Sequence, residues 1–352
     1  RSEVLGLISK DSFCIAVAGT HGKTTTSAMI AHILTDTGYG CSAFLGGILT
    51  NYGSNFLVGS NNVVVVEADE YDRSFLTLHP DIAVITSMDA DHLDIYGDGA
   101  SLEEAFTLFS KQVKAGGTLI RQDSLPLTTG ETYSATDQES MYRSDNIRVD
   151  GSAFMFSYVS SGQRIDDIRL KLPGTHNVEN AVAAIAVALK VGIDPEKIKM
   201  ALETFKGVKR RFEIVLESPE HVVIDDYAHH PQELQACFNA VRMLYPNKKM
   251  TVVFQPHLYS RTRDFADQFA VVLAEADKLL LMDIYPAREL PIEGIDSSFL
   301  LSKINNVTAE ICGKEMLRAR ISALDPELLL FVGAGDIDTM VQPAKKILEN
   351  AE

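Results

Sequence analysis

The feature that most limits the fold of this chain is a short glycine-containing loop at residues 19–26, with the sequence Gly-Thr-His-Gly-Lys-Thr-Thr-Thr. An apolar run at 14–18 comes directly before it, and the residues at 27–34 have a helical pattern. Strand, glycine loop, lysine, hydroxyl and helix is the order found in phosphate-binding loops, where backbone N–H groups and a helix N-terminus face the anion. The loop therefore predicts a nucleotide-binding α/β domain.

Two side chains of the loop have the chemistry that a bound nucleotide requires. Lys23 is placed to reach the outer phosphates, and Thr24 is placed to ligate Mg2+. The strict pattern has one more glycine five positions before Gly22, where this chain has Val17, so the loop is a shorter variant. The alternative interpretation is a glycine-rich turn between strand and helix that binds no ligand.

Length and composition agree with two domains of ordinary size. The chain has 352 residues, of which 46% are hydrophobic and 23% are charged, as in globular proteins. The longest apolar runs, at 63–66, 279–282 and 328–332, have the length of strands and are too short to span a membrane. A net charge of −16 argues against nucleic-acid partners, and four widely spaced cysteines indicate a reduced, cytoplasmic protein.

Acidic and imidazole side chains follow two strands that we expect to be buried in a parallel sheet. The strand at 63–66 ends in Glu67, and the strand at 82–87 is followed by His92 within an acidic cluster. Because parallel strands bring their carboxyl ends to one sheet edge, Glu67 and His92 should lie with Thr24 as metal ligands. The alternatives are a solvated acidic strand end and a structural histidine.

The middle of the chain contains two further features. Residues 101–113 predict a helix opened by a capping box of Ser101 and Glu104. Residues 128–172 alternate between apolar and polar side chains and predict a small antiparallel appendage.

Two asparagines open the alanine-rich helix at 181–191. Asn177 and Asn180 are three positions apart, so both amides can face one planar ligand such as adenine. The alternative is a helix cap next to an uninvolved asparagine.

The last part of the chain again alternates strands with helices. Its apolar runs at 222–224, 251–254, 279–282 and 328–332 each end in a polar cluster. This arrangement is typical of a ligand-facing parallel sheet, with the ligand at the carboxyl ends of the strands.

Taken together and in this order, the motifs resemble those of the Mur ligases of peptidoglycan synthesis. They are Gly19-Thr-His-Gly-Lys-Thr-Thr, Glu67-Ala-Asp-Glu, Asp89-Ala-Asp-His-Leu-Asp, His176-Asn-x-x-Asn180, Arg210-Arg-Phe, Asp226-Tyr-Ala-His-His-Pro, Gln255-Pro-His257 and Arg261-Thr-Arg263. The resemblance implies an α/β chain with a central P-loop ATPase domain at 1–206 and a C-terminal Rossmann-like domain at 207–352. It implies that the central domain has a mostly parallel sheet, and that the N-terminal UDP-binding domain of the family is missing here.

The resemblance also implies roles for individual residues. Those expected at ATP are Gly19, Thr20, His21, Gly22, Lys23, Thr24, Thr25, Asn177, Asn180, Arg211 and Asp226. Those expected at two Mg2+ ions, for which Mn2+ can substitute, are Thr24, Glu67 and His92. Those expected to be catalytic are Lys23, Glu67, His92, Arg211, His229, His257 and Arg261, with Tyr227 and Arg263 also lining the amine side.

The sequence departs from the family pattern in two respects. Leu258 stands where related enzymes have an arginine, so binding of the amino-acid carboxylate should depend on Arg261. Some sister ligases use a carbamylated lysine on the helix after the metal histidine, but residues 101–110 contain no lysine, and we do not predict that modification.

The implied activity is ATP-dependent amide-bond formation between L-alanine and the lactyl carboxylate of UDP-N-acetylmuramate, through an acyl phosphate. One alternative is a recycling ligase that adds a tripeptide to the same acceptor. Another, from a different class, is a P-loop regulatory protein that binds ATP without ligase activity. The oligomeric state is left open.

Overall fold

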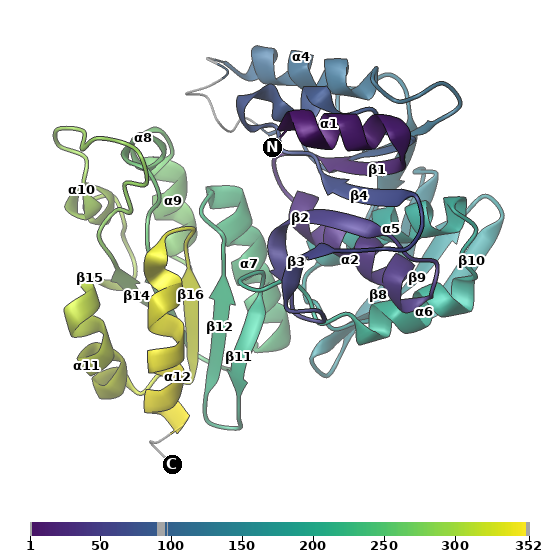
Figure 1. The fold of residues 1–352 in the computed structure, drawn as a ribbon. Coiled ribbons are helices and arrows are strands. Elements are labelled where there is room, and N and C mark those ends of the chain that lie inside the picture. The colour runs from purple at the N-terminus through teal and green to yellow at the C-terminus, as the bar shows by residue number, and fades with distance from the viewer. Residues whose placement is uncertain (1, 90–95, 97, 350–352) are drawn as a thin grey trace. The chain divides into compact units, whose positions relative to one another are not determined.

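The computed structural model describes residues 2–89, 96 and 98–349 (Figure 1). The chain divides into two compact units, Arg1–Lys209 (unit 1) and Arg210–Glu352 (unit 2). The boundary predicted from the sequence, between 206 and 207, lies close to this division. No helix of the described residues has the length and apolar character needed to cross a membrane.

Unit 1 is built on one sheet, which has ten strands in the described part of the chain, in the order β10-β9-β8-β7-β6-β5-β1-β4-β2-β3. The strands are β1 (Phe13–Ala18), β2 (Ser42–Leu49), β3 (Ser54–Leu57), β4 (Val63–Glu67), β5 (Ile82–Ile85), β6 (Thr118–Gln122), β7 (Glu131–Ser134), β8 (Tyr142–Asp150), β9 (Ala153–Ser160) and β10 (Gln163–Leu170). The helices are α1 (Ser2–Asp11), α2 (Lys23–Asp36), η1 (Tyr71–Thr77), α4 (Gly99–Ser110), α5 (Thr175–Lys190) and α6 (Pro195–Thr204).

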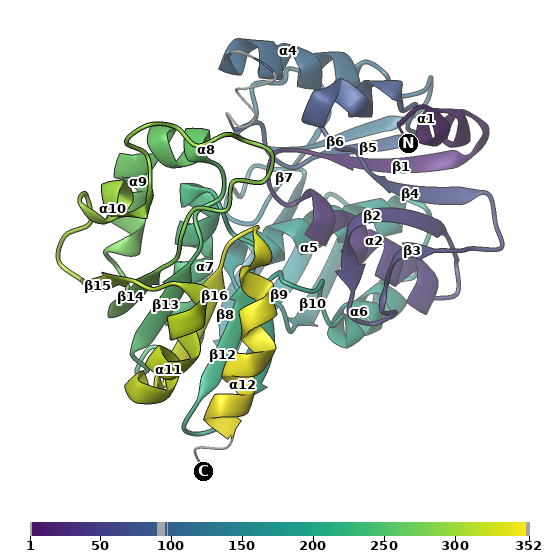
Figure 2. The ribbon, with the colours of Figure 1, turned by 60° about the vertical axis from the view of Figure 1, so that its left-hand side comes forward.

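The central strands of this sheet are parallel and buried on both faces. β1 pairs in parallel with β4 and β5, and apolar side chains of these strands pack on η1 and α4. Figure 2 shows α1, η1 and α4 over one face, with α2, α5 and α6 on the other. Because neither face meets water, these strands are continuously apolar, which is why the sequence identified them.

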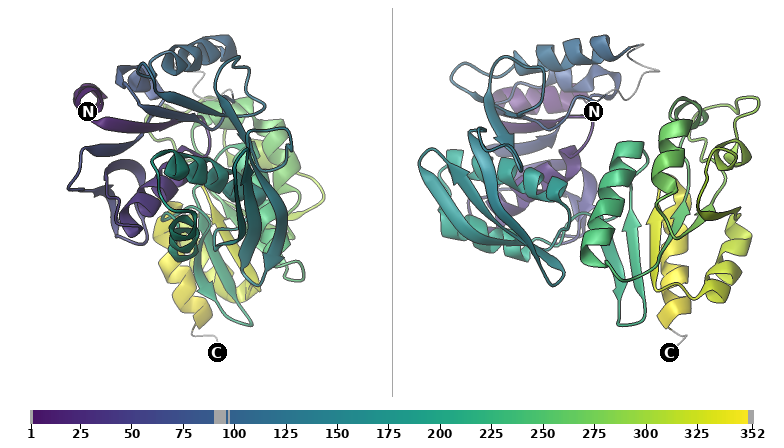
Figure 3. Two further views of the ribbon diagram at one scale, coloured as in Figure 1. Left: turned by 90° about the vertical axis from the view of Figure 1, so that its right-hand side faces the viewer. Right: turned by 180° about the vertical axis from the view of Figure 1, so that it is seen from behind.

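The expected antiparallel appendage is an extension of the same sheet. β6, β7 and β8 are still parallel neighbours, and the direction alternates only from β8 to β9 and β10. Figure 3 shows these long strands at the edge of unit 1. The expected capping box of Ser101 and Glu104 is wrong, because the helix begins at Gly99 and the Asp98 side chain accepts from the Ser101 N–H.

Unit 2 has a second sheet, with six strands among the described residues, in the order β11-β12-β16-β13-β14-β15. Its strands are β11 (Glu213–Glu217), β12 (Val222–Asp226), β13 (Met250–Phe254), β14 (Lys278–Leu281), β15 (Thr308–Ile311) and β16 (Leu328–Val332). Its helices are α7 (Pro231–Leu244), α8 (Tyr259–Asp264), α9 (Ala266–Leu273), α10 (Ser297–Leu301), α11 (Lys314–Leu324), η2 (Asp336–Met340) and α12 (Val341–Glu349).

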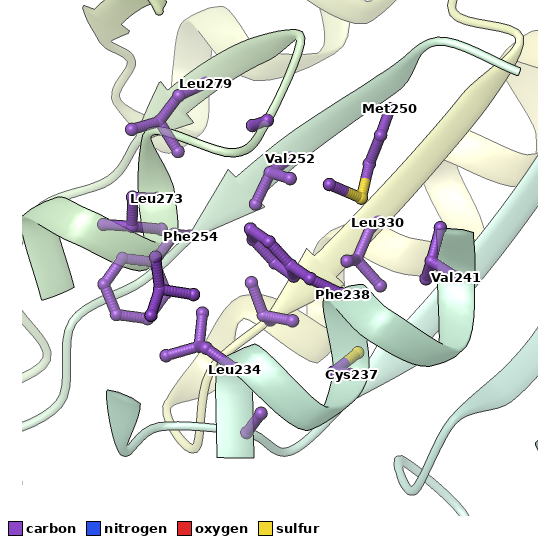
Figure 4. Packing of buried hydrophobic residues seen from close by; sticks show 14 of the residues in the cluster. Leu234, Cys237, Phe238, Val241, Met250, Val252, Phe254, Leu273, Leu279 and Leu330 are labelled. Carbon is purple, nitrogen blue, oxygen red and sulfur yellow. The ribbon is translucent and has the colours of Figure 1, made fainter. Parts of the chain in front are cut away.

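All pairs in this second sheet are parallel except β11 with β12. One core fills the face under α7 and α9, where Phe238 packs among Leu234, Val252 and Leu330 (Figure 4). A second core fills the other face under α11, η2 and α12. The predicted α/β architecture with a second parallel-sheet domain is confirmed.

Candidate active site

The glycine loop of unit 1 is held against the end of β5. Gly19 and Gly22 have φ angles of 137° and 81°, which favour glycine, and a Cβ at Gly19 would overlap the Thr86 hydroxyl. The Ser87 hydroxyl lies 2.9 Å from that of Thr20 and accepts from the His21 N–H at 2.6 Å. The loop conformation is therefore fixed by two hydroxyl residues that the sequence analysis did not single out.

Lys23 is the first residue of α2 and is nearly buried. Its ammonium donates to the Gly19 carbonyl at 2.5 Å and lies 2.8 Å from the carboxylate of Glu70, whose side chain is 1% exposed. Burial lowers the pKa of Lys23, but the Glu70 and Glu67 carboxylates raise it to a net value above the ordinary one. Lys23 is thus a fixed positive charge at the loop, and Glu70 is a partner that the sequence analysis missed.

Thr24 and Glu67 meet, as their positions at one sheet edge predict. The Thr24 hydroxyl donates to Glu67 Oε1 at 2.8 Å, while Glu67 Oε2 accepts from the Gly46 N–H at 2.6 Å. A Cβ at Gly46 would lie 2.5 Å from Glu67 Oε1, so only glycine leaves room for the carboxylate there. A hydroxyl and a carboxylate at this distance are oxygen donors of the kind that Mg2+ prefers, and the pair fits such an ion.

The other proposed ligand, His92, lies outside the described residues. Asp89, at the near end of the same acidic segment, is described: its N–H donates to the Thr20 hydroxyl at 3.0 Å. Its carboxylate is 3.7 Å from His21 Nε2. The start of the acidic segment therefore contacts the glycine loop.

Asn177 and Asn180 lie in the first turns of α5 and contact both each other and the loop. Asn180 donates to Asn177 Oδ1 at 3.3 Å and accepts from the Thr26 hydroxyl at 3.1 Å. A Cβ at Gly22 would be 2.8 Å from Asn180 Oδ1. Both side chains are buried, so they are rigid groups at the start of α2, where a nucleotide would extend from the loop.

A cavity of about 320 Å³ opens beside Glu67. Its lining comes from α1, β2, β4 and η1 and includes Phe44, Asp69 and Tyr71. Within η1 the backbone at Asp72 and Arg73 has φ angles of 54°, a conformation unusual for residues other than glycine. Glu67, which bonds to Thr24, therefore lines a space that can take part of a ligand.

In unit 2 the polar residues gather at the carboxyl ends of β12, β13 and β14. Asp226 accepts from the N–H groups of Phe212 and Ala228, both at 2.7 Å. Burial raises the pKa of Asp226 to about 6, against the opposing effect of Arg211 and the two N–H groups. Burial likewise raises the pKa of the adjacent Asp225 to about 7. Asp226 thus holds the segment after residue 210 against the end of β12.

Arg210, Arg211 and Tyr227 form one cluster. The guanidinium groups of Arg210 and Arg211 lie 5.0 and 4.9 Å from the centre of the Tyr227 ring. Arg210 also donates to the carbonyls of Gly333 and Gly335, so it is tied to the turn after β16. Arg211 has no hydrogen bond of this kind among the described residues.

His229 and His257 face each other with ring centres 5.7 Å apart. His229 Nδ1 lies 2.9 Å from the Tyr227 carbonyl and 3.3 Å from Glu233 Oε2, which both only accept, so this nitrogen carries a proton. His257 Nδ1 lies 3.4 Å from the Arg261 guanidinium, which only donates, so here Nε2 carries the proton. The two rings therefore face each other with a proton on His229 Nδ1 and on His257 Nε2.

Arg261 and Arg263 differ in their surroundings. Arg261 is buried on α8 next to His257, whereas Arg263 is half-exposed and pairs with the adjacent Asp264 at 2.7 Å. Leu258, at the start of α8, has φ 71° and ψ 137°, a strained backbone for a leucine. The structure thus brings Arg261 to the histidine pair and leaves Arg263 outside it.

The chain matches two family models. The Mur ligase middle domain matches residues 17–188, and the Mur ligase, glutamate ligase domain matches residues 210–335. Among curated proteins, the UDP-N-acetylmuramate–L-alanine ligases of Flavobacterium psychrophilum and Flavobacterium johnsoniae are 50% and 49% identical to it, over 349 and 348 residues. These matches cover 99% of this chain and 78% and 77% of the two relatives.

A solved structure agrees with these matches. The UDP-N-acetylmuramate–alanine ligase of Thermotoga maritima superposes with a TM-score of 0.81 at 29% identity. The match covers 99% of this chain and 77% of that one.

Proposed function

The chain belongs to the Mur ligase family of ATP-dependent ligases, and from this premise we propose that it joins L-alanine to the lactyl carboxylate of UDP-N-acetylmuramate. The observation that carries the proposal is the hydrogen bond of 2.8 Å between Thr24 and Glu67 beside the nearly buried Lys23. A ligase that activates a carboxylate needs this combination of a fixed cation and hard oxygen donors at the phosphates.

In the first half-reaction the lactyl carboxylate attacks the γ-phosphorus of ATP, the bond to the bridging oxygen breaks, and ADP leaves. Lys23 contacts the β- and γ-phosphates, and the N–H groups of residues 19–25 surround them. Asn177 and Asn180 bind the adenine. Thr24 and Glu67, with the predicted ligand His92, would hold Mg2+, which would offset negative charge on the phosphates. The product is an acyl phosphate.

In the second half-reaction the amine of L-alanine attacks the acyl carbon, and the bond to the phosphate oxygen breaks. His229 accepts the amine proton at Nε2, and His257 donates from Nε2–H to the oxygen on which charge develops. Arg261 binds the carboxylate of the amino acid, and Arg211 and Asp226 contact the nucleotide. The roles of the two histidines are supported by neighbours that place a proton on His229 Nδ1 and on His257 Nε2, and the other roles by the family resemblance.

The amine substrate is the part of the proposal that needs the sharpest test. The full-length protein is assayed for phosphate release with ATP, Mg2+ and UDP-N-acetylmuramate, with L-alanine or the tripeptide as the amine. We expect release with L-alanine and little with the tripeptide. Release with the tripeptide alone would assign the recycling reaction, and ATP binding without amine-dependent release would assign a regulatory role.

A further inference from the structure

Tyr285 is a side chain of unit 2 to which the mechanism above gives no role. It lies just after β14, and its ring stacks on that of His257 with centres 5.7 Å apart and planes inclined by 16°. His257 contacts His229, and His229 contacts Tyr227 at 5.4 Å. Tyr285 therefore ends a row of four rings that contains both proposed catalytic histidines.

The backbone fixes Tyr285 opposite His257. The Tyr285 N–H donates to the Pro256 carbonyl at 2.8 Å, and its carbonyl accepts from the Leu258 N–H at 2.9 Å. These bonds involve the residues on both sides of His257, so the segments that contain His257 and Tyr285 run parallel in a fixed register. Because the bonds are made by the main chain, substitution of the Tyr285 side chain leaves them in place.

The base of the Tyr285 ring is closely packed. A Cβ at Gly335 would lie 2.7 Å from Tyr285 Cγ and would overlap Gln255 Oε1. The φ of Gly335 is −83°, which any residue adopts, so glycine is required here for space alone. The ring thus has close neighbours at its base as well as on the face toward His257.

The charges around His257 favour its neutral form. The titratable and charged groups that face it are His229 after β12, Arg261 on α8, and Arg288 and Glu289 after Tyr285. Burial, His229 and Arg261 lower the pKa of His257 to about 4, and Glu289 partly opposes them. Protonation at Nδ1 would break the contact with the Arg261 guanidinium, because both groups would then be donors.

We propose that Tyr285 is a positioning residue for the amine half-reaction. Its ring holds the orientation of His257 and shields the imidazole from water, and together these two effects keep the imidazole neutral. The claim about catalysis rests on the proposed function. The claim about the imidazole rests on the ring stack, the backbone register and the packing at Gly335, and is independent of the proposed function.

The first test measures the pKa of the His257 imidazole and needs no assay of activity. The His257 ring proton is followed by NMR against pH in the full-length protein and is assigned with His257→Gln. Tyr285→Leu removes the ring, admits water, and should raise the pKa of His257 from about 4 toward about 6.5. Tyr285→Phe keeps the ring and should leave the titration as in the wild type.

The second test is the pH dependence of kcat/KM for L-alanine. Protonation of His257 at Nδ1 breaks its contact with Arg261, the proposed carboxylate-binding residue, so kcat/KM of Tyr285→Leu should fall between pH 8 and pH 6. The fall reaches about fourfold if the pKa rises to about 6.5, because about a quarter of His257 is then neutral at pH 6. This fall should come on top of any change that the wild type shows between the same two pH values. Tyr285→Phe should have the same pH profile as the wild type. We expect the loss in kcat/KM for L-alanine, with KM for ATP unchanged.

Two further variants keep the outcome decisive. Leu290→Ala lies in the same loop with its side chain 84% exposed and should change neither titration nor profile. Gly335→Ala displaces the base of the Tyr285 ring and should raise the pKa of His257 even if Tyr285→Leu does not fold. Unchanged titration in both Tyr285→Leu and Gly335→Ala would overturn the proposal. Absence of L-alanine-dependent turnover in the wild type would instead refute the proposed function, and the NMR result would still decide the role of Tyr285.

Discussion

At the scale of single residues, the site in unit 1 depends on buried charge. Lys23 and Glu70 form an ion pair 2.8 Å long with almost no access to water. Removing one member of such a pair leaves the other charged and buried, which costs much more than an exposed pair would. Lys23 therefore stabilises the loop as well as serving the proposed chemistry, and these two effects can be separated.

Lys23→Ala should lower the free energy of unfolding by about 3–5 kcal/mol, because the buried Glu70 carboxylate loses the cation that lies 2.8 Å from it. Lys23→Ala with Glu70→Gln should recover most of that loss, since the carboxylate charge of Glu70 is removed as well. Both variants should lack ATP-dependent phosphate release. Urea unfolding and the phosphate assay measure the two effects, and a Lys23→Ala protein of wild-type stability would contradict this account.

Gly46 provides a test of Thr24 and Glu67 as proposed metal ligands that substitutes neither residue. Gly46→Ala puts a Cβ 2.5 Å from Glu67 Oε1, so the carboxylate must move away from Thr24. The concentration of Mg2+ needed for half-maximal activity should rise at least about tenfold, the order that displacing a supporting group costs. Gly162→Ala, where nothing lies near the added Cβ, is the matched control and should behave as the wild type.

At the scale of elements, a buried histidine joins three segments of unit 1. His32 on α2 has Nδ1 2.9 Å from the Tyr52 hydroxyl and Nε2 2.9 Å from the Ala201 carbonyl on α6. Its ring also contacts Phe205 just after α6. The carbonyl requires a proton on Nε2, so the neutral imidazole accepts from Tyr52 and satisfies both neighbours.

The free energy of unfolding should therefore decrease as the pH is lowered, because of His32. Burial lowers its pKa below the ordinary 6.5, so the unfolded chain takes up a proton before the folded one does. The contribution of His32 is present above pH 6.5 and is lost as the pH falls through the lower folded value. The free energy of unfolding, measured with urea at pH 7.5 and pH 5.5, should differ less between the two pH values for His32→Gln than for the wild type. An equal pH difference in the two proteins would contradict this account.

At the scale of the whole molecule, the chain consists of two units with separate cores. The sheet of unit 2 is covered on one face by α7 and α9 and on the other by α11 and α12, all from the same unit. A domain with two complete layers of helices over its own sheet has the hydrophobic core that independent folding requires.

The fragment 210–352 should fold by itself. Expressed alone, it should give helical and strand signals by circular dichroism and one cooperative thermal transition. Phe238→Ala, at the centre of the core shown in Figure 4, should lower its stability by about 3–5 kcal/mol. A fragment that is unfolded without residues 1–209 would show that its core is insufficient.

The sequence by itself determined the α/β class, the glycine loop, the strands buried on both faces, and the meeting of Thr24 with Glu67. These features are local or follow from the alignment of parallel strand ends, so periodicity and order in the chain are sufficient to predict them. The edge strands β11 and β15 were not predicted, because half-exposed strands lack a continuous apolar run. Only the tertiary structure decided which partners surround the site. In unit 1, Glu70, Ser87 and Gly46 contact the loop and Glu67, and in unit 2 Tyr285 contacts His257, through hydrogen bonds and packing between segments distant in sequence. No pattern along the chain encodes those distances.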